Sequence, residues 1–441
     1  MAKVKPRVLK GFRDYLPARM IPRQRMLSLI EETFQRFGFL PLMTPALEGL
    51  DILTGKYGGE GEGLLYRFKD LGDRDVALRY DLTVPLARVI AQYPDLPLPF
   101  RRYQIAPVWR AEKPARGRFR EFVQCDGDIV GSSDMLADAE VVQLACELLT
   151  NLGVTDFRVR LNNRKILTGL MSRVGVQDAA AEAGVLRTID KLDKIGLEKM
   201  VTVLREENGL DEAQVVSIKS FLAISGTHRE RLAEASALLR EEPIGMEGLA
   251  ELTQVLDTTE ALGLGDSLEL DLSIARGLAY YTGTIYEVFL TNLPGFGAVM
   301  GGGRYDTLIG VFKGQEIPAV GISLGIDRLL EGLVELELLE EKQAVAQVLV
   351  AVFDASTAGY SAAIARRLRA AGIACELFPS YAKLPKQFRR AERAGQRWVL
   401  VPGPDEAAKN VVRVKDLSTG DQEDVALESL VEYLSGKNAG S

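Results

Sequence analysis

The residues of this sequence that are best suited to chemistry are arginines that stand beside glycines or where predicted strands end. They are Arg110, Arg118, Arg120, Arg276 and Arg328. Arg276 lies in "DLSIARGLAYYTG" (271–283), where no acidic residue stands within four positions of it. Guanidinium groups stay charged and can pair with two phosphate oxygens at once, and glycines let a ligand approach the backbone closely. Together these residues indicate a site for a polyphosphate.

The phosphates are not expected to lie in a glycine-rich loop at the start of a helix, because the sequence contains neither a Walker loop nor the set of protein kinase motifs. The segment "GGGRYD" (301–306) is a weak signal by itself, since consecutive glycines more often mark a turn or close packing.

Composition narrows the class of protein. The chain has 441 residues, 47 % of them hydrophobic, which is enough for two or three domains with their own cores. Cys125, Cys146 and Cys375 are too widely spaced for a disulfide framework or a zinc site. The single histidine, His228, lies in a polar segment, so a Ser-His-Asp triad or an imidazole metal site is unlikely to explain the function.

Two basic runs interrupt a chain whose net charge is −7. Residues 101–120 hold seven Lys or Arg against one Glu, and residues 383–397 hold six against one. A single such run is usually a solvated face. Two of them in an acidic chain suggest two contacts with anionic ligands.

The elements that must position these residues follow from the hydrophobic pattern. An amphipathic helix is expected over 19–37, then a Pro-interrupted edge strand over 38–48. Strands are expected at 64–70, 75–81, 100–110 and 121–131, the last two forming a hairpin with a long basic loop, and a helix at 134–153.

From about 165 the pattern becomes charged and helical, and strands return near 267. After a charged link at 339–344, strands and helices alternate to the end of the chain, which is typical of a small α/β domain with a largely parallel sheet. The fold class is therefore α+β, with a mostly antiparallel sheet core, a helical insertion and a C-terminal α/β domain.

Several segments, taken in order, resemble known motifs. "FGFLPLMTPALE" (37–48), "VWRAE" through "RFREF" (108–122) and "GISLGIDRLL" (321–330) resemble motifs 1, 2 and 3 of class II aminoacyl-tRNA synthetases. More narrowly, "LRYDLTVPLAR", "QCDGDIVG", "RGLAYYTG" and "GGGRYD" resemble the histidyl-tRNA synthetase family. The resemblance runs from Gly11 to about Leu434.

This resemblance implies a division of the chain. A catalytic core is expected in two parts, 1–164 with motifs 1 and 2, and 266–340 with the histidine motifs and motif 3. Residues 165–265 would form a helical insertion and residues 346–441 an anticodon-binding domain. The basic run at 383–397 would be the RNA-facing surface of that domain.

The resemblance also implies roles in binding ATP. Arg110 and Arg276 would be catalytic, because positive charge must meet the α-phosphate when the histidine carboxylate attacks it. Arg120 and Arg328 would hold the outer phosphates and stack on adenine, and Glu112 would reach the adenine amino group. Arg118 is placed with ATP as well, with the tRNA acceptor end as its alternative ligand.

A second set of residues would bind histidine. The α-ammonium group would be received by Asp81, Thr83 and Gln124, and the two imidazole nitrogens by Asp128 and Tyr281, with Tyr280 lining the same pocket. Hydrogen bonds to both nitrogens would reject apolar amino acids of similar shape by about 10⁴-fold. The alternatives are that Asp81 caps a turn and that the tyrosines are a core pair, since neighbours on a strand point to opposite faces.

The sequence departs from the family pattern at two positions. Ala279 stands where the family usually has aspartate, which removes a charge close to Arg276, and Asp327 replaces the glutamate of motif 3. Neither residue is an expected ligand contact.

The resemblance implies L-histidine, ATP and tRNA(His) as substrates, Mg²⁺ as the ion that accompanies ATP, and no dedicated metal ligands. It also implies a homodimer formed through motif 1, a cytoplasmic location and no membrane partner. One alternative is the synthetase-like regulatory subunit of ATP phosphoribosyltransferase, which senses histidine without catalysis; another is a tRNA-sensing module. The retained arginines and the C-terminal domain favour the enzyme over both.

Overall fold

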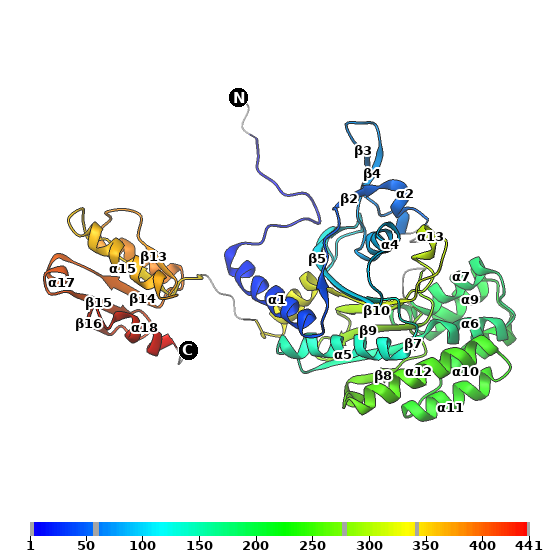
Figure 1. Ribbon diagram of the computed structural model, residues 1–441. Coiled ribbons are helices and arrows are strands. Elements are labelled where there is room, and N and C mark those ends of the chain that lie inside the picture. The colour runs from blue at the N-terminus through cyan, green and yellow to red at the C-terminus, as the bar shows by residue number, and fades with distance from the viewer. Residues whose placement is uncertain (1–3, 56–60, 276–279, 340–343, 439–441) are drawn as a thin grey trace. The chain divides into compact units, whose positions relative to one another are not determined.

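The computed structural model of the protein describes residues 4–55, 61–275, 280–339 and 344–438, which pack into two compact units (Figure 1). The larger unit comprises Met1–Arg13 and Met26–Leu339. The smaller unit comprises Asp14–Arg25 and Glu340–Ser441.

The larger unit is built around an eight-stranded sheet with the order β1-β5-β6-β11-β10-β9-β7-β8. Its strands are β1 (Leu40–Pro41), β5 (Phe100–Trp109), β6 (Glu121–Val130), β7 (Phe157–Asn163), β8 (Leu268–Leu270), β9 (Thr284–Leu290), β10 (Met300–Arg304) and β11 (Ala319–Gly325). All neighbouring pairs are antiparallel except β1–β5 and β7–β8 at the two edges. The expected mostly antiparallel core is confirmed.

The β5–β6 hairpin was expected from two runs rich in β-branched and aromatic residues. The strands pair over ten residues, from Phe100 opposite Val130 to Trp109 opposite Glu121. Successive side chains alternate between the faces of the sheet, so alternate residues of β6 from Gln124 onward share one face. The loop at the end of this hairpin carries the first basic run.

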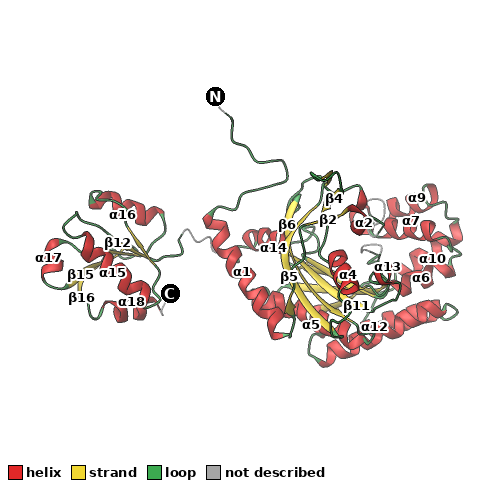
Figure 2. Ribbon diagram, turned by 45° about the horizontal axis from the view of Figure 1, so that its top comes forward, coloured by secondary structure: helices red, strands yellow, loops and turns green. Residues whose placement is uncertain are grey.

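Helices cover the sheet and bring the rest of the chain to it. The long helices α5 (Met135–Asn151) and α12 (Pro243–Ala261) lie along one face (Figure 2). Helix α1 (Pro17–Arg36) is the helix expected at 19–37; its Phe34 ring stacks on Tyr103 of β5 at 5.3 Å between centroids. Helices α4 (Thr83–Gln92) and α14 (Ile326–Glu335) each begin beside the cavity described below.

Two of the expected strands do not join the main sheet. β3 (Arg67–Lys69) and β4 (Asp75–Leu78) pair with β2 (Leu47–Gly49) in a separate three-stranded sheet with the order β2-β4-β3. The short helix α2 (Leu50–Leu53) follows β2.

The residues between β7 and β8 are helical. They form α6 (Arg164–Arg173), α7 (Ala179–Ile189), α8 (Leu192–Ile195), α9 (Leu197–Glu206), α10 (Glu212–Leu222), α11 (His228–Leu239) and α12. Capping boxes start α10 at Asp211 and α11 at Thr227, as the polar residues there favour. Helices α6 and α12 cross closely, since a Cβ added to Gly169 would lie 2.6 Å from the Cα of Gly245.

The C-terminal part of the chain forms a five-stranded sheet with the order β13-β12-β14-β15-β16. Its elements are β12 (Val348–Val350), α15 (Ala358–Ala370), β13 (Cys375–Leu377), α16 (Leu384–Arg393), β14 (Trp398–Val401), α17 (Pro404–Ala408), β15 (Val411–Asp416), β16 (Gln422–Ala426) and α18 (Leu430–Asn438). The first three strands of the sheet are parallel, as the alternation predicts, and β15 and β16 add to it antiparallel. In the described part of the chain no helix combines the length and apolar character that a membrane span requires.

Candidate active site

A cavity of about 280 Å³ opens where α4, the β5–β6 hairpin, β9, β10 and the start of α14 come together. Its wall is formed by Asp81, Thr83, Arg110, Glu112, Gly117, Arg118, Phe119, Phe122, Gln124, Tyr280, Tyr281, Glu287, Ala298, Val299, Met300, Gly301, Ser323, Gly325, Asp327 and Arg328. The structure therefore gathers most of the residues that the sequence analysis assigned to histidine and ATP.

Asp81 is held at the first turn of α4 and is only 2 % exposed. One carboxylate oxygen accepts a hydrogen bond from the backbone N–H of Val84 at 3.1 Å, and the other accepts from the Tyr280 hydroxyl at 3.3 Å. Asp81 can therefore both cap the turn before α4 and bind a ligand. The first bond fixes the carboxylate, and the second oxygen lies at the cavity.

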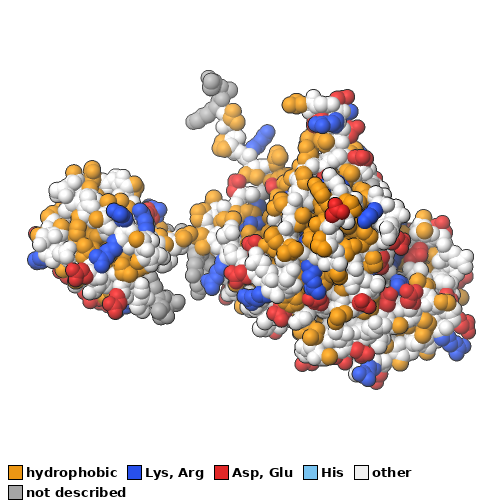
Figure 3. Space-filling model, in the orientation of Figure 1, with side chains coloured by type: hydrophobic (Ala, Val, Ile, Leu, Met, Phe, Trp, Pro, Cys, Tyr) orange, Lys and Arg blue, Asp and Glu red, His pale blue; other side chains and the backbone are white. Residues whose placement is uncertain are grey.

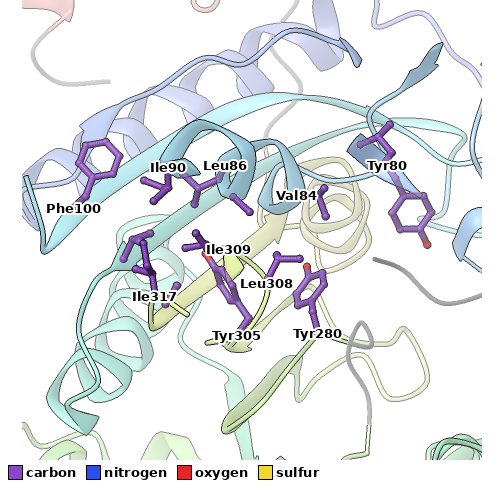
Figure 4. Close-up of a cluster of buried hydrophobic side chains, with 14 of the residues drawn as sticks. Tyr80, Val84, Leu86, Ile90, Phe100, Tyr280, Tyr305, Leu308, Ile309 and Ile317 are labelled. Carbon is purple, nitrogen blue, oxygen red and sulfur yellow. The ribbon is translucent and has the colours of Figure 1, made fainter. Parts of the chain in front are cut away.

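Tyr280 and Tyr281 lie in the loop before β9, so the alternation of a strand does not apply to them, and both reach the cavity. Their rings meet edge to face at 5.1 Å, and Tyr280 also packs on Tyr305 at 5.8 Å (Figure 4). Burial, together with the carboxylates of Asp128 and Asp126, raises the pKa of Tyr281. The phenol therefore stays protonated and able to donate a hydrogen bond.

Asp128 does not reach the cavity wall. It is 2 % exposed, accepts a hydrogen bond from the Tyr305 hydroxyl at 2.5 Å and lies 2.7 Å from the guanidinium group of Arg102, which is fully buried. Burial raises the pKa of Asp128, while Arg102 and Tyr305 oppose that rise. The direct contact of Asp128 with an imidazole nitrogen therefore stays a prediction.

The arginine side of the cavity begins at the β5–β6 hairpin. Arg110 donates from Nε to the carbonyl oxygen of Tyr80 at 3.1 Å, and its guanidinium carbon lies 4.2 Å from the centroid of the Tyr80 ring. Glu112 lies 3.2 Å from Arg118 and 4.0 Å from Arg110. This carboxylate holds the two arginines near each other on one wall.

Arg328 lines the cavity from the start of α14. Its Nη1 donates to the carbonyl oxygen of Ala298 at 2.9 Å, and its guanidinium carbon lies 5.7 Å from the Phe296 ring. Gly117 of the hairpin loop has a positive φ of 63°, and a Cβ there would lie 3.2 Å from Cγ of Arg328. Glycine at this turn therefore lets the loop approach the arginine.

Two predicted arginines are not placed in the cavity. Arg120 donates from Nε to the carbonyl oxygen of Glu112 at 3.0 Å and from Nη1 to that of Lys10 at 3.4 Å, so its side chain joins the hairpin loop to the N-terminal segment. The expected contact of Arg120 with the outer phosphates stays a prediction. Arg276, and Ala279 with it, lies outside the described residues.

The sequence analysis missed Glu287, Ser323 and Gly301, which line the floor of the cavity. The pairing of β9, β10 and β11 places Gly301 opposite both Glu287 and Ser323. A Cβ on Gly301 would meet only the carbonyl oxygen of Tyr286, at 3.6 Å, so the glycine leaves room between the two polar side chains. A glutamate in the apolar run "TIYEVFL" was the available signal for Glu287.

Asp327, the departure in motif 3, ties several segments together behind the arginine wall. One of its carboxylate oxygens accepts from the backbone N–H of Val123 at 2.7 Å, and the other lies 3.7 Å from Arg13. Arg13 also stacks on Phe119, with 3.7 Å from its guanidinium carbon to the ring centroid. The shorter acid still reaches its partners.

The chemistry of the cavity is two-sided. Asp81, Gln124 and Glu287 offer acceptors to a cationic group, while Arg110, Arg118 and Arg328 offer paired donors to an anion. A cavity with both sets of side chains suits a ligand that carries an ammonium group beside a second ligand that carries phosphates. Over the ranges that the structure describes, no three His, Cys, Asp or Glu side chains are grouped as metal ligands would be.

Comparisons with known proteins show the family of this chain. A family model described as "Histidyl-tRNA synthetase" matches residues 11–329, and one described as "Anticodon binding domain" matches residues 347–437. A histidine–tRNA ligase from Rhodopirellula baltica is 44 % identical over 425 residues, which cover 96 % of each chain. Another, from Wolinella succinogenes, is 43 % identical over 99 % of each chain.

Solved structures give the same picture. The histidyl-tRNA synthetase of Nostoc sp. PCC 7120 superposes with a TM-score of 0.87 at 34 % identity, covering 99 % of this chain and 100 % of that one. A protein from Bacillus halodurans C, described as an ATP phosphoribosyltransferase regulatory subunit/histidyl-tRNA synthetase, has a TM-score of 0.72 at 24 % identity over 88 % of this chain and 97 % of its own. The second likeness concerns the fold alone.

Proposed function

The chain belongs to the histidyl-tRNA synthetase family, and we propose that the cavity described above is where it joins histidine to ATP. The protein is a histidine–tRNA ligase: it uses ATP to charge tRNA(His) with L-histidine. The observation that supports the cavity as the site is the convergence of an ammonium-accepting wall and an arginine wall from five separate chain segments.

In the first step a carboxylate oxygen of histidine attacks the α-phosphorus of ATP, the bond to the bridging oxygen breaks and pyrophosphate leaves. Negative charge gathers on the phosphoryl oxygens and on the leaving group, so fixed cations lower the barrier. Arg110 is oriented for this role by the Tyr80 carbonyl and ring. Arg276 keeps the same role as a prediction from the family resemblance.

Arg118 and Arg328 are proposed to bind the remaining phosphates and the adenine ring. Arg118 comes from the β5–β6 hairpin loop and Arg328 from the start of α14, and Phe119 lies with them on the cavity surface. Glu112, which lines the same wall, is proposed to accept from the adenine amino group. Arg120 supports the loop from behind through the carbonyl oxygen of Glu112.

Histidine is proposed to lie over Gly301, with its α-ammonium group facing Asp81, Thr83 and Gln124. Tyr281 donates or accepts at one imidazole nitrogen. Asp128 does not line the cavity and is ion-paired with Arg102, so we propose that it acts on the imidazole indirectly, through its electrostatic influence on Tyr281. A polar ligand with two ring nitrogens fits this wall better than an apolar side chain.

Mg²⁺ is proposed to enter with the phosphates of ATP rather than at a resident site. Mg²⁺ commonly keeps several waters and binds one or two carboxylates together with substrate phosphates. Among the described residues no three His, Cys, Asp or Glu side chains are grouped to hold the ion, so the ATP phosphates and water would supply most of its ligands. The ion would neutralise charge on the departing pyrophosphate.

In the second step a hydroxyl of the terminal ribose of tRNA attacks the acyl carbon, and AMP leaves. The C-terminal part of the chain is proposed to hold the anticodon on the α16 basic face, which we define as Lys386, Arg389, Arg390 and Arg393. These side chains are exposed, whereas Gln387 and Ala391 of the same helix are buried. RNA phosphates bind such surfaces with a strong dependence on salt.

A homodimer is proposed to form through the motif 1 region. Figure 3 shows hydrophobic side chains gathered over the region of β2, β5 and α4. Exposed residues there include Leu40, Met43 and Tyr93, which are 57 %, 68 % and 56 % exposed. Large apolar side chains concentrated on one surface are typical of a protein interface. If the dimer forms there, Met43→Glu should lower the molar mass measured by light scattering to that of a monomer.

We propose a cytoplasmic location, since the tRNA substrate is used where translation takes place. The alternative of a regulatory subunit of ATP phosphoribosyltransferase is less well supported, because relatives covering nearly the whole chain are ligases.

The proposed site is tested by charging of a tRNA(His) transcript with labelled histidine. Arg328→Ala and Asp81→Ala should each lower charging strongly while the protein stays folded, and Ser361→Ala, in the C-terminal part, should not. Normal charging by both cavity variants would refute this placement of the site.

A further inference from the structure

The wall that is proposed to receive the ammonium group is supported by a row of polar residues across the sheet. Asp126 of β6 lies directly opposite Ser323 of β11, and Gln124 lies two residues from Asp126 on the same face. Gln124 and Asp126 are 7 % and 1 % exposed. Gln124 and Ser323 line the cavity, whereas Asp126 lies behind them.

The hydrogen bonds in this row have a direction. The Nε2 of Gln124 donates to the Ser323 hydroxyl oxygen at 2.5 Å, so that oxygen is already an acceptor. Its own hydrogen can be given to the carboxylate of Asp126, which lies directly opposite Ser323 in the β6–β11 pairing. When Asp126 is ionised its oxygens can only accept, and a hydroxyl has one hydrogen to give, so the donors then run from Gln124 to Ser323 to Asp126.

This direction decides which end of the Gln124 amide faces the ligand. An amide can be turned by 180° with little change in shape, and its hydrogen-bond partners set its orientation. With the NH₂ group committed to Ser323, the carbonyl oxygen Oε1 remains, and it is buried with no hydrogen-bond partner among the described residues. A buried acceptor without a partner is costly unless a ligand supplies a donor.

We propose that Asp126 and Ser323 are positioning residues which lock the Gln124 amide so that its Oε1 accepts a hydrogen bond from the α-ammonium group of the amino-acid substrate. The inference rests on the proposed function, in which this cavity binds histidine. It adds that the acceptor is set by two residues behind the ligand. Without Ser323, the amide is free to turn and present its NH₂ group to a cation.

The test compares L-histidine with 3-(imidazol-4-yl)propionate, the same molecule without its amino group, by calorimetric titration of the full chain. Wild type should prefer L-histidine. Ser323→Ala should lower the affinity for L-histidine about 10-fold, the scale of a hydrogen bond to a charged group, and leave the affinity for the analogue unchanged. Ser323→Cys keeps the shape with a weak donor and acceptor and should show the same loss.

Three further variants separate positioning from general damage. Ser323→Thr retains the hydroxyl and should retain the preference for L-histidine over the analogue. Gln124→Leu should lose that preference, and adding Ser323→Ala to it should cause no further loss, because both changes remove one interaction. Ser361→Ala deletes a buried hydroxyl in the C-terminal part and should leave both affinities unchanged.

The preference for L-histidine over the analogue decides the outcome. An unchanged preference in Ser323→Ala, or equal losses for both ligands, would overturn the positioning role while leaving the proposed function intact. Failure of the wild-type chain to bind L-histidine at all would instead refute the proposed function.

Discussion

Replacing Asp81 with asparagine should separate the binding of histidine from the binding of ATP. The two side chains have the same shape, and the asparagine oxygen can keep the 3.1 Å bond from the Val84 N–H that caps α4. The change therefore falls on the second oxygen, which lies 3.3 Å from the Tyr280 hydroxyl and is proposed to meet the α-ammonium group. An NH₂ group there is a donor facing a cation.

The size of the effect follows from the charge-assisted hydrogen bond that is lost. Such a bond contributes about 1.5–3 kcal/mol, which corresponds to a KM for histidine raised about 10- to 150-fold. The KM for ATP should stay as in wild type, because the changed oxygen of Asp81 accepts from the Tyr280 hydroxyl on the side of the cavity that is proposed to bind histidine. Pyrophosphate exchange at varied histidine and ATP concentrations measures both values.

The matched control is Asp178→Asn, which changes a capping aspartate at the start of α7 in the helical region. It should leave both KM values unchanged. A histidine KM for Asp81→Asn close to that of wild type, or equal rises in both KM values, would refute the assignment of Asp81 to the ammonium group.

Four more outcomes are expected. Tyr281→Phe should raise the KM for histidine about 10-fold and leave that for ATP unchanged; equal rises would refute its role. Arg304→Met leaves Asp138 buried without its counter-charge and should cost about 3–5 kcal/mol in urea unfolding; a smaller loss contradicts this. Burial raises the pKa of Asp126 to about 7, so this residue contributes a loss of stability as pH rises from 4 to 7, and Asp126→Asn should remove that contribution from the measured slope. Neutralising the α16 basic face should raise the KM for tRNA and weaken its salt dependence; no change would refute the RNA contact.

The sequence predicted the elements with strong periodicity and clear ends. The β5–β6 hairpin and α5 both lie where the alternation of the strands and the predicted ends of the helix placed them. β7 was missed although "FRVRLNN" alternates, because it adjoins the helical region whose charged pattern dominated the interpretation. The sheet that β3 and β4 join could not be predicted, since strand pairing depends on distant partners.

The site was predicted mainly through the family resemblance, and the departures have physical causes. Asp128 pairs with Arg102 across the β5–β6 hairpin, and that register cannot be known from β6 alone. Tyr280 and Tyr281 both reach the cavity because they lie in a loop, where no alternation holds. The Gln124–Ser323 contact joins residues 199 positions apart, so only the folded sheet reveals it.

The central claim is that this cavity activates histidine with ATP. The most direct measurement is ATP–pyrophosphate exchange by the purified chain with each of the twenty amino acids in turn. Exchange should occur with L-histidine and stay at background with the other nineteen. Background exchange with L-histidine, or comparable exchange with another amino acid, would contradict the account.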